Sequence, residues 1–166
     1  MSEQDDSEYF LPYYGKRNGT ITYPNGNIYT GELSKIKEED DDGDYPSGYG
    51  IMRYANGDVY EGDGYVSRGE FSHYGNGIMR YANGDVFEGE WEGCMSNGIM
   101  RYANGDVYEG EWSNILNDDQ IEDATDMEIQ LSLDTKYGNG IMRYANGNVY
   151  TGQWRFNKKD GNGTIL

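Results

Sequence analysis

Alternating apolar and polar residues along the chain predict short β-strands. In Tyr108-Glu-Gly-Glu-Trp112 the rings and the glycine occupy every second position, and the two glutamates lie between them. Successive side chains of a strand point to opposite faces, so the rings and the glycine share one face. The preceding run at 99–102, Ile-Met-Arg-Tyr, predicts a second strand. An Asn-Gly pair between the two runs predicts a β-hairpin with a type I′ turn, in which both turn residues have positive φ.

This hairpin unit recurs along the chain. Residues 97–112 reappear almost unchanged at 76–91, with small edits at 49–64 and 139–154, in a looser form at 18–33 and in part at 161–166. A regular internal repeat indicates a stacked architecture in which each unit contacts its neighbours. Because a lone hairpin is marginally stable in water, the hairpins must pair edge to edge. The predicted fold is all-β: an elongated single-layer antiparallel sheet of stacked β-hairpins, with loop insertions between repeats.

Stacking the hairpins aligns their aromatic residues in columns on one face of the predicted sheet. With a two-residue turn, Ile51 and Arg53 share this face, while Met52 and Tyr54 join Val59 on the other; a longer turn would shift the register. No helices are predicted to cover the aromatic face, and an exposed apolar face of this size indicates a binding surface. The residues expected to form this partner-binding aromatic face are Tyr29, Tyr60, Phe87, Trp91, Tyr108, Trp112, Tyr150 and Trp154.

The unit resembles the MORN (membrane occupation and recognition nexus) repeat. Residues 75–91 carry the glycine and aromatic positions of that family with Phe87 in place of a tyrosine, and residues 138–154 carry all of them. Departures in the other copies are Arg17, Leu33, Gly64 and Ser96. The resemblance implies an open sheet of hairpins with an aromatic groove, acting as a scaffold, a dimerisation module or a peptide-binding platform. It also raises the alternative of phospholipid binding.

The spacing between repeats predicts the domain organisation. Residues 1–17 are expected to form an acidic N-terminal tail and cap, and residues 18–166 the repeat domain. Acidic insertions at 34–47 and 113–137 interrupt the repeats. Since repeat boundaries recur at the same place in the unit, both insertions should project from the same edge of the sheet.

The two insertions carry further hypotheses. Residues 34–47 place Glu38, Asp40 and Asp42 at the spacing of a calcium loop, but Tyr49 stands where that loop needs a glutamate, so a solvated acidic loop is favoured. The 113–137 insertion contains apolar residues at strand or helix spacing. Our hypothesis is that it folds over the aromatic face in the fourth repeat.

The charge balance restricts the class of partner. With 13 basic and 30 acidic residues, the net charge is −17, which disfavours nucleic acids and anionic membranes because both attract basic proteins. It favours a basic protein partner, and the open edges of the sheet allow a homodimer by sheet extension. We expect a column of arginines to form salt-bridge ladders, each with a carboxylate of its own hairpin, or to stack on a neighbouring Tyr or Phe ring. The alternative is that the column binds lipid headgroups. These residues are Arg53, Arg80, Arg101 and Arg143.

The sequence lacks patterns typical of enzymes. Its single histidine, His73, and its single cysteine, Cys94, lie on different repeats, so we expect a surface histidine and no internal disulfide. Neither zinc-ligand spacing nor a phosphate-binding Gly-Lys-Ser/Thr loop occurs. We therefore expect no catalytic residue, no cofactor and no metal site.

These observations favour a non-catalytic protein-interaction scaffold. It would bind a partner, or itself, through the aromatic groove, with the acidic loops selecting a basic partner. The alternatives are a peripheral phospholipid-binding module and a structural component of a larger assembly. Residues 1–8 lack the basic and apolar regions of a secretory signal, so we expect an intracellular protein, cytoplasmic or peripheral on a cytoskeletal or particle structure.

Overall fold

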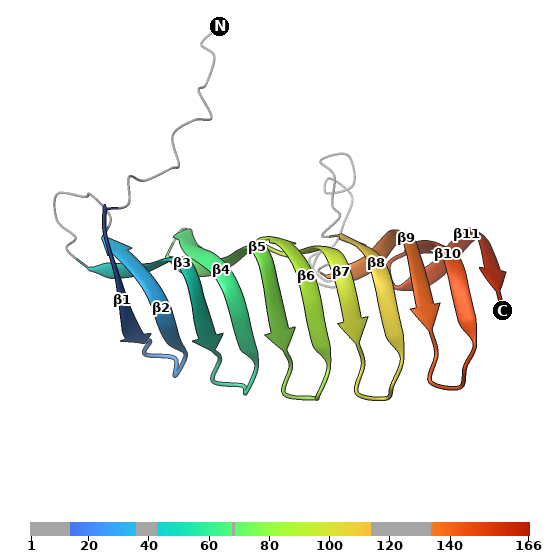
Figure 1. Ribbon diagram of the computed structural model, residues 1–166, viewed down its shortest axis with the longest axis horizontal. Helices are drawn as coiled ribbons and strands as arrows, with labels where there is room; N and C mark the ends of the chain where they lie inside the picture. The colour runs from blue at the N-terminus through green and yellow to red at the C-terminus, as the bar shows by residue number, and fades with distance from the viewer. Residues whose placement is uncertain (1–13, 36–42, 68, 114–133) are drawn as a thin grey trace, which may run out of the picture.

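The protein forms one open antiparallel sheet of eleven strands, in which neighbours in sequence are neighbours in space (Figure 1). The computed structural model describes residues 14–35, 43–67, 69–113 and 134–166. The strands are β1 (Tyr14–Thr22), β2 (Ile28–Lys35), β3 (Asp44–Arg53), β4 (Val59–Ser67), β5 (Glu70–Arg80), β6 (Val86–Glu92), β7 (Met95–Arg101), β8 (Val107–Ser113), β9 (Thr135–Arg143), β10 (Val149–Arg155) and β11 (Lys158–Ile165). The described part of the chain offers no helix of the length and apolar character needed to span a membrane.

Asn-Gly turns close the hairpins, but with a longer loop than the sequence predicted. In the second hairpin the Gly57 amide donates to the Tyr54 carbonyl at 3.0 Å, and the Tyr54 amide donates to the Asp58 carbonyl at 2.9 Å. Gly57 has a φ of +97°, whereas Asn56 is not among the residues with positive φ. This geometry matches a type I turn followed by a left-handed glycine. The predicted type I′ turn is therefore wrong, because only the glycine takes the left-handed conformation.

The longer loop reverses the predicted assignment of residues to faces. Met52 pairs with Tyr60 and Ile51 pairs with Glu61 across the second hairpin. Directly opposed residues lie on the same face, so methionine, not isoleucine, joins the aromatic column. The predicted placement of Ile51 and Arg53 with the rings is wrong, because the loop has an odd number of residues instead of two.

Successive turns are joined to one another by hydrogen bonds. The Asp85 Oδ1 atom accepts from the Ala103 amide of the next turn at 2.8 Å, and its Oδ2 atom accepts from Asn83 Nδ2 at 3.0 Å. The same bond links Ala82 to Asp58 and Ala145 to Asp106 at 2.8 Å. Each hairpin is thus positioned on its neighbour at the turn edge as well as through the strands.

A row of glycines crosses the whole sheet at one register. Gly62, for example, pairs with Gly50 on one side and with Gly77 on the other. A Cβ atom at Gly77 would lie 2.5 Å from the hydroxyl oxygen of Tyr60 and 2.6 Å from its ring atom Cε2. The glycines are required here because tyrosine rings lie flat against the backbone of this row.

The strands bend beyond this row of glycines. The pairing register shifts between Gly62 and Asp63, between Glu90 and Trp91, and between Gly110 and Trp112. Such bulges bend a strand and increase its twist. In Figure 1 the strand ends opposite the turns curve away from the plane of the sheet.

The strands extend into segments that were predicted to be tail or insertion. β1 begins at Tyr14, within the predicted tail 1–17, and pairs there with Lys35 of β2. Residues 44–47 belong to β3, and residues 135–137 belong to β9. The strands are therefore longer than the repeated sequence motif indicated. Residues 1–13, 36–42 and 114–133 lie outside the described residues, and they include Glu38, Asp40 and Asp42 of the possible calcium loop.

Candidate functional site

The aromatic columns form one continuous stack of rings along the inner face of the bent sheet. Trp112 lies between Phe87 and Tyr108, with centroid distances of 5.6 and 5.0 Å and interplanar angles of 84° and 89°. Trp154 lies in the same way between Tyr108 and Tyr150, at 5.3 and 5.2 Å. Edge-to-face pairs at this spacing are favourable beyond the area that they bury. The stack therefore couples each repeat to the next.

All eight predicted aromatic residues lie in this stack or beside it, but they are not exposed. Their relative exposures are 0 % for Tyr29, Tyr60, Phe87 and Tyr108, 2 % for Trp91, 4 % for Tyr150, 5 % for Trp154 and 6 % for Trp112. The expectation of an exposed aromatic face is therefore wrong: the rings form the core of the protein. Direct contact between these rings and a partner would require the bent sheet to open, and their part in partner binding stays a prediction.

Side chains from the bent strand ends cover the rings. His73, Met95 and Lys136 lie opposite Gly64, Trp91 and Trp112 in the strand register, and Phe71 packs on Tyr60 at 6.1 Å. Sequence reasoning missed these covering residues. Their signal is positional, because His73, Met95 and Lys136 stand three or four residues before the second glycine of their repeats, and Phe71 stands six before it.

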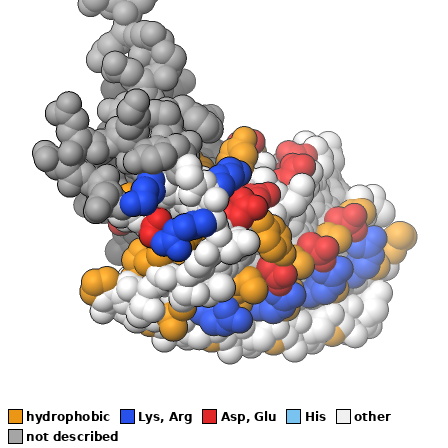
Figure 2. Space-filling view, turned by 60° about the vertical axis from the view of Figure 1, so that its left-hand side comes forward, with side chains coloured by type: hydrophobic (Ala, Val, Ile, Leu, Met, Phe, Trp, Pro, Cys, Tyr) orange, Lys and Arg blue, Asp and Glu red, His pale blue; other side chains and the backbone are white. Residues whose placement is uncertain are grey.

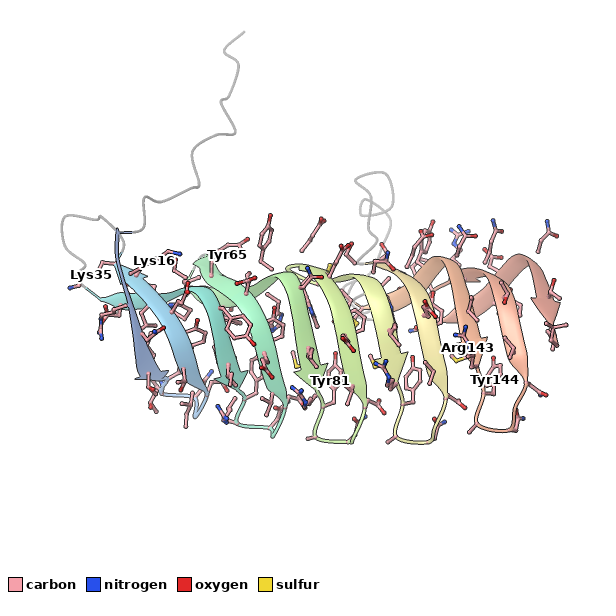
Figure 3. All side chains as sticks on the ribbon, in the orientation of Figure 1. Lys16, Lys35, Tyr65, Tyr81, Arg143 and Tyr144 are labelled. Carbon is pink, nitrogen blue, oxygen red and sulfur yellow. The ribbon has the colours of Figure 1, made fainter. Side chains whose placement is uncertain are left out.

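The hydroxyls of the tyrosines in the ring stack are satisfied within the strands. The Tyr60 hydroxyl donates to the Asp63 carbonyl at 2.8 Å, and the Tyr108 hydroxyl donates to the Glu111 carbonyl at 3.0 Å. Burial is the main cause that raises the pKa of both phenols. Each hydroxyl donates a hydrogen bond to a backbone carbonyl next to the bulge, where the pairing between strands is interrupted. These tyrosines are structural, and the tyrosines that precede the turns, such as Tyr81 and Tyr144 in Figure 3, pack against the same core.

His73 is half-buried and packs against the core, contrary to the expectation of a surface histidine. Its ring lies 4.2 Å from the Tyr60 centroid and 4.8 Å from the Trp91 centroid, and its Nε2 atom is hydrogen-bonded to the Tyr54 hydroxyl at 2.7 Å. Desolvation lowers its pKa to about 4. The histidine is therefore neutral near pH 7 and acts as a packing residue.

Lys136 occupies an aromatic cage in the fourth repeat. Its Nζ atom lies 5.2 Å from the Tyr102 centroid, 5.6 Å from those of Tyr108 and Trp112, and 5.8 Å from that of Trp154. Only 9 % of the residue is exposed, and burial lowers its pKa. Cation–π attraction stabilises an ammonium ion in this setting. Most of the 113–137 insertion lies outside the described residues, so the hypothesis that it covers the aromatic face is not tested. Lys136, near the end of this segment, lies opposite Trp112.

The outer face of the sheet carries ordered rows of opposite charge. Nη1 of Arg80 lies 3.3 Å from the Glu61 carboxylate, Arg101 repeats this with Glu88 at 3.3 Å, and Arg143 pairs with Glu109 at 3.2 Å. Figure 2 shows basic and acidic side chains in parallel rows along the sheet. These three arginines form salt bridges, but the prediction of a carboxylate from the same hairpin is wrong, because each glutamate comes from the preceding hairpin.

Arg53 departs from this pattern. Thr30 stands on β2 where the other hairpins have glutamate, as the pairing of Thr30 with Ile51 shows. Within the described residues, Arg53 has no carboxylate within salt-bridge distance. All four arginines are exposed, so each pair contributes at most about 1 kcal/mol.

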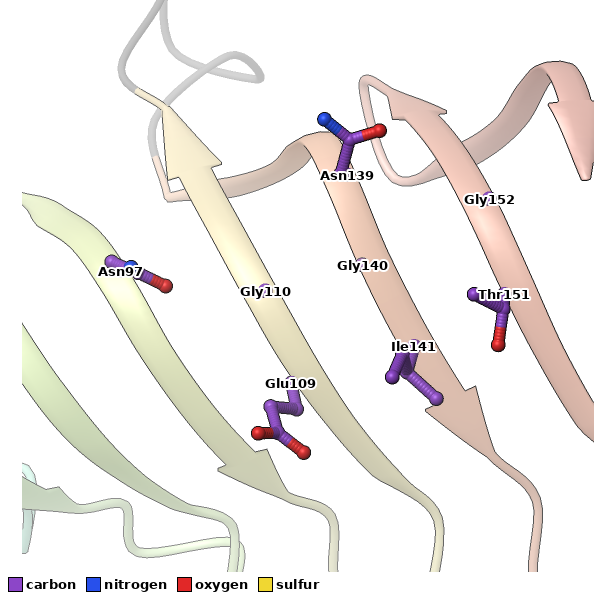
Figure 4. Close-up of a pocket in the computed structure, with 8 residues that line it drawn as sticks. All are labelled: Asn97, Glu109, Gly110, Asn139, Gly140, Ile141, Thr151 and Gly152. Atoms are coloured by element: carbon purple, nitrogen blue, oxygen red, sulfur yellow. The ribbon is translucent and has the colours of Figure 1, made fainter.

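A shallow depression of about 370 Å³ opens on the outer face around the row of glycines (Figure 4). Its lining residues are Asn97, Glu109, Gly110, Asn139, Gly140, Ile141, Thr151 and Gly152. The carboxylate of Glu109 is held by Arg143. No group of three residues able to hold a metal ion occurs within the described ranges. The depression thus presents amide and hydroxyl groups without a paired acid and base.

Comparison with protein families matches the MORN repeat at six stretches: residues 16–28, 42–59, 75–86, 108–116, 138–149 and 150–166. The chain is a MORN repeat protein. Its all-β sheet of hairpins is the arrangement that the repeat predicts. MORN repeats generally serve in non-enzymatic proteins.

Other comparisons add little. No curated protein matches this MORN chain. Among solved structures, the SAS-4 (dCPAP) TCP domain in complex with a proline-rich motif of Ana2 (dSTIL) of Drosophila melanogaster is similar, with 16 % identity over 93 % of this chain and 97 % of that chain. Its TM-score is 0.27, which is too low to bear on the function of this protein.

Proposed function

We propose that this MORN protein is a non-catalytic scaffold that binds a protein with a basic surface. The partner docks along the edge of the sheet opposite the Asn-Gly turns. The observation that carries this proposal is the segregation of charge toward that edge.

Both acidic insertions and the N-terminal segment leave the sheet at the same edge. Tyr14 pairs with Lys35, and Lys35 pairs with Asp44, so the N-terminal segment and residues 36–42 connect to the sheet side by side. Ser113 pairs with Thr135 at the corresponding ends of β8 and β9. The strand register therefore supports the expectation that the insertions project from a common edge.

These segments hold much of the charge of the protein. Residues 1–13, 36–42 and 114–133 contain 15 of the 30 acidic residues and one of the 13 basic residues. The described strands are closer to neutral, and three of their glutamates are already paired with arginine. An acidic edge attached to a stiff sheet favours a basic partner and accelerates its encounter.

The ring stack supplies the stiffness that a scaffold needs. The third and fourth hairpins, for example, are joined by strand pairing, ring contacts and turn-to-turn hydrogen bonds. A partner that contacts several repeats at once therefore meets a fixed spacing of charges. The alternative of a lipid surface has less support, because Arg80, Arg101 and Arg143 are engaged with glutamates.

Affinity capture with the full chain tests the scaffold. A variant with Glu38→Gln, Glu39→Gln, Asp40→Asn, Asp41→Asn and Asp42→Asn should lose the proteins that wild type captures at low ionic strength. Wild-type capture should weaken at high ionic strength, because exposed charges are screened. A matched control exchanges Glu and Asp within 38–42 and should bind like wild type. Equal capture by the neutralised variant and wild type would refute the acidic edge as the binding surface.

A further inference from the structure

Three exposed tyrosines and one aspartate gather on the outer face of β3, β4 and β5. Tyr49 lies opposite Asp63 in the strand register, and Asp63 lies opposite Tyr74 on its other side. Directly opposed residues share a face, and Tyr65 shares it too because it stands two residues after Asp63 on β4. Tyr49, Tyr65 and Tyr74 are 52 %, 39 % and 57 % exposed. We name these four residues the tyrosine patch.

The tyrosine patch departs from the pattern of the next repeat. In the third hairpin the same outer row carries Asn76 opposite Glu90, and Glu90 lies opposite Asn97 on β7. Asparagine thus stands on both sides of the carboxylate, where the patch carries Tyr49 and Tyr74. Since the units are otherwise almost identical, the sheet itself does not require aromatic residues at these places. An exposed aromatic cluster that the fold does not need is typical of an interaction surface.

Asp63 provides an unpaired negative charge at the centre of the patch. Its neighbour on the same face, Glu61, is already engaged: it accepts from the Tyr49 hydroxyl at 2.9 Å and lies 3.3 Å from Nη1 of Arg80. Within the described residues, no basic side chain lies within salt-bridge distance of Asp63. A carboxylate between aromatic rings attracts a cation, because both groups interact favourably with positive charge. Charge complementarity therefore points to a cationic side chain of a partner.

The arrangement of the rings favours a guanidinium group over an ammonium group. Tyr65 and Tyr74 meet edge to face, with centroids 6.1 Å apart and an interplanar angle of 74°. The third ring does not close a cage around them, because the Tyr49 hydroxyl is directed to Glu61. A methylated ammonium group needs aromatic walls on several sides. A planar guanidinium needs only one ring to stack on and one carboxylate for its fork of donors.

We propose that the tyrosine patch binds an arginine side chain of a partner protein. The guanidinium lies flat against the ring of Tyr74 and donates two hydrogen bonds to the carboxylate of Asp63. Tyr65 lies near the end of β4 that is opposite the Asn-Gly turns (Figure 3), so a partner at that edge can reach the patch. The inference does not depend on the acidic insertions, because all four residues lie in described strands outside them. Failure of one surface is therefore distinguishable from failure of the other.

Titration of the full chain with the peptide Ac-Gly-Arg-Gly-amide, followed by nuclear magnetic resonance, tests the proposal. Physiological ionic strength screens the attraction by distant carboxylates. We expect saturable shifts of the amide signals of Asp63, Tyr65 and Tyr74, and weaker binding of Ac-Gly-Lys-Gly-amide, whose ammonium cannot stack and form a bidentate pair. Asp63→Asn should lower the affinity for the arginine peptide by about threefold to fivefold. Tyr74→Asn, which introduces the residue of the next repeat, should weaken binding in the same direction.

Glu90→Gln is the matched control, because it removes one charge from the same row where asparagines flank the carboxylate. It should leave the affinity unchanged, and equal losses in Asp63→Asn and Glu90→Gln would overturn the proposal, since binding would then follow net charge alone. The proposal is also overturned if the arginine and lysine peptides bind equally, or if a trimethyl-lysine peptide binds more tightly than the arginine peptide. Arg68→Gln should not change the affinity. Tighter binding by that variant would mean that an arginine of this chain occupies the patch, which would overturn the proposal as well.

Discussion

The row of glycines makes a quantitative prediction that can be tested at Gly77. In Gly77→Ala the new Cβ would lie 2.5 to 2.7 Å from the Oη, Cε2 and Cζ atoms of Tyr60, against about 3.5–4.0 Å for a comfortable contact. The Tyr60 ring is fully buried and held by His73 and Trp91 at 4.2 and 5.5 Å. It would have to shift by about 1 Å within a close-packed core.

Overpacking of this kind costs about 1–3 kcal/mol. Replacing glycine by alanine regains about 0.4–1 kcal/mol, because the unfolded chain loses conformational freedom. Since Gly77 does not have a positive φ, no backbone strain adds to this balance. We expect Gly77→Ala to lower the free energy of unfolding by about 1–2 kcal/mol, the difference between those two effects.

A double-mutant cycle measured by urea unfolding separates the clash from other effects. In a Tyr60→Leu background the ring is gone, so Gly77→Ala should be neutral or slightly stabilising, which gives a coupling of about 2 kcal/mol. Gly93→Ala is the control: it has a φ of +77° and open space around it, so its cost should be the same in both backgrounds. Equal costs of Gly77→Ala with and without the Tyr60 ring would refute the idea that the ring dictates glycine at this position.

Three further predictions concern other contacts. Asp85→Ala should lower the free energy of unfolding by about 1 kcal/mol in urea titrations, because the Ala103 amide loses its acceptor at 2.8 Å; Asp85→Asn, which keeps that oxygen, should cost less. The folded-state pKa of His73, about 4, lies below its ordinary value of 6.5, so its stabilising effect is complete above pH 6.5. As the pH decreases from 6.5 to 4, the free energy of unfolding should fall by about 3 kcal/mol through this histidine, because only the unfolded chain takes up its proton. In His73→Phe, urea unfolding measured between those pH values should lack this loss. Lys136→Met should keep or raise the melting temperature, because it removes a buried charge and because Met95 already fills the equivalent place opposite Trp91. Lys136→Ala should lower the free energy of unfolding by about 2 kcal/mol, because it leaves a cavity. A lower stability for the Met variant than for the Ala variant would contradict this reasoning.

The hairpins and their stacking were predictable because their signals are local. Each Asn-Gly pair needs a left-handed glycine within a few residues, and each Tyr-x-Gly-x-Trp run alternates with the period of a strand. Five turn copies of the Asn-Gly pair, each followed by an aromatic-x-Gly run, made the sheet predictable without knowledge of distant contacts. The arginine ladder followed from the same periodicity, although its partners come from the preceding hairpin.

The assignment of faces failed on one structural detail. A loop from Tyr54 to Asp58 places Met52 opposite Tyr60, while a two-residue loop would have placed a neighbouring residue there. Because side chains alternate along a strand, a change of loop length by an odd number of residues exchanges the two faces. Sequence letters alone allow both loops.

The prediction that the aromatic rings are exposed was wrong for a different reason. Exposure of the rings depends on what lies over them, and the covering residues, such as His73 and Lys136, come from less regular parts of the chain. They reach the rings because bulges bend the strand ends over the sheet. The sequence by itself determined the repeat, the hairpins and the columns of rings, since these depend on contacts within one unit or between adjacent units. Only the tertiary structure decided that the rings are core and that Lys136 lies in an aromatic cage, because burial depends on how far the whole sheet bends.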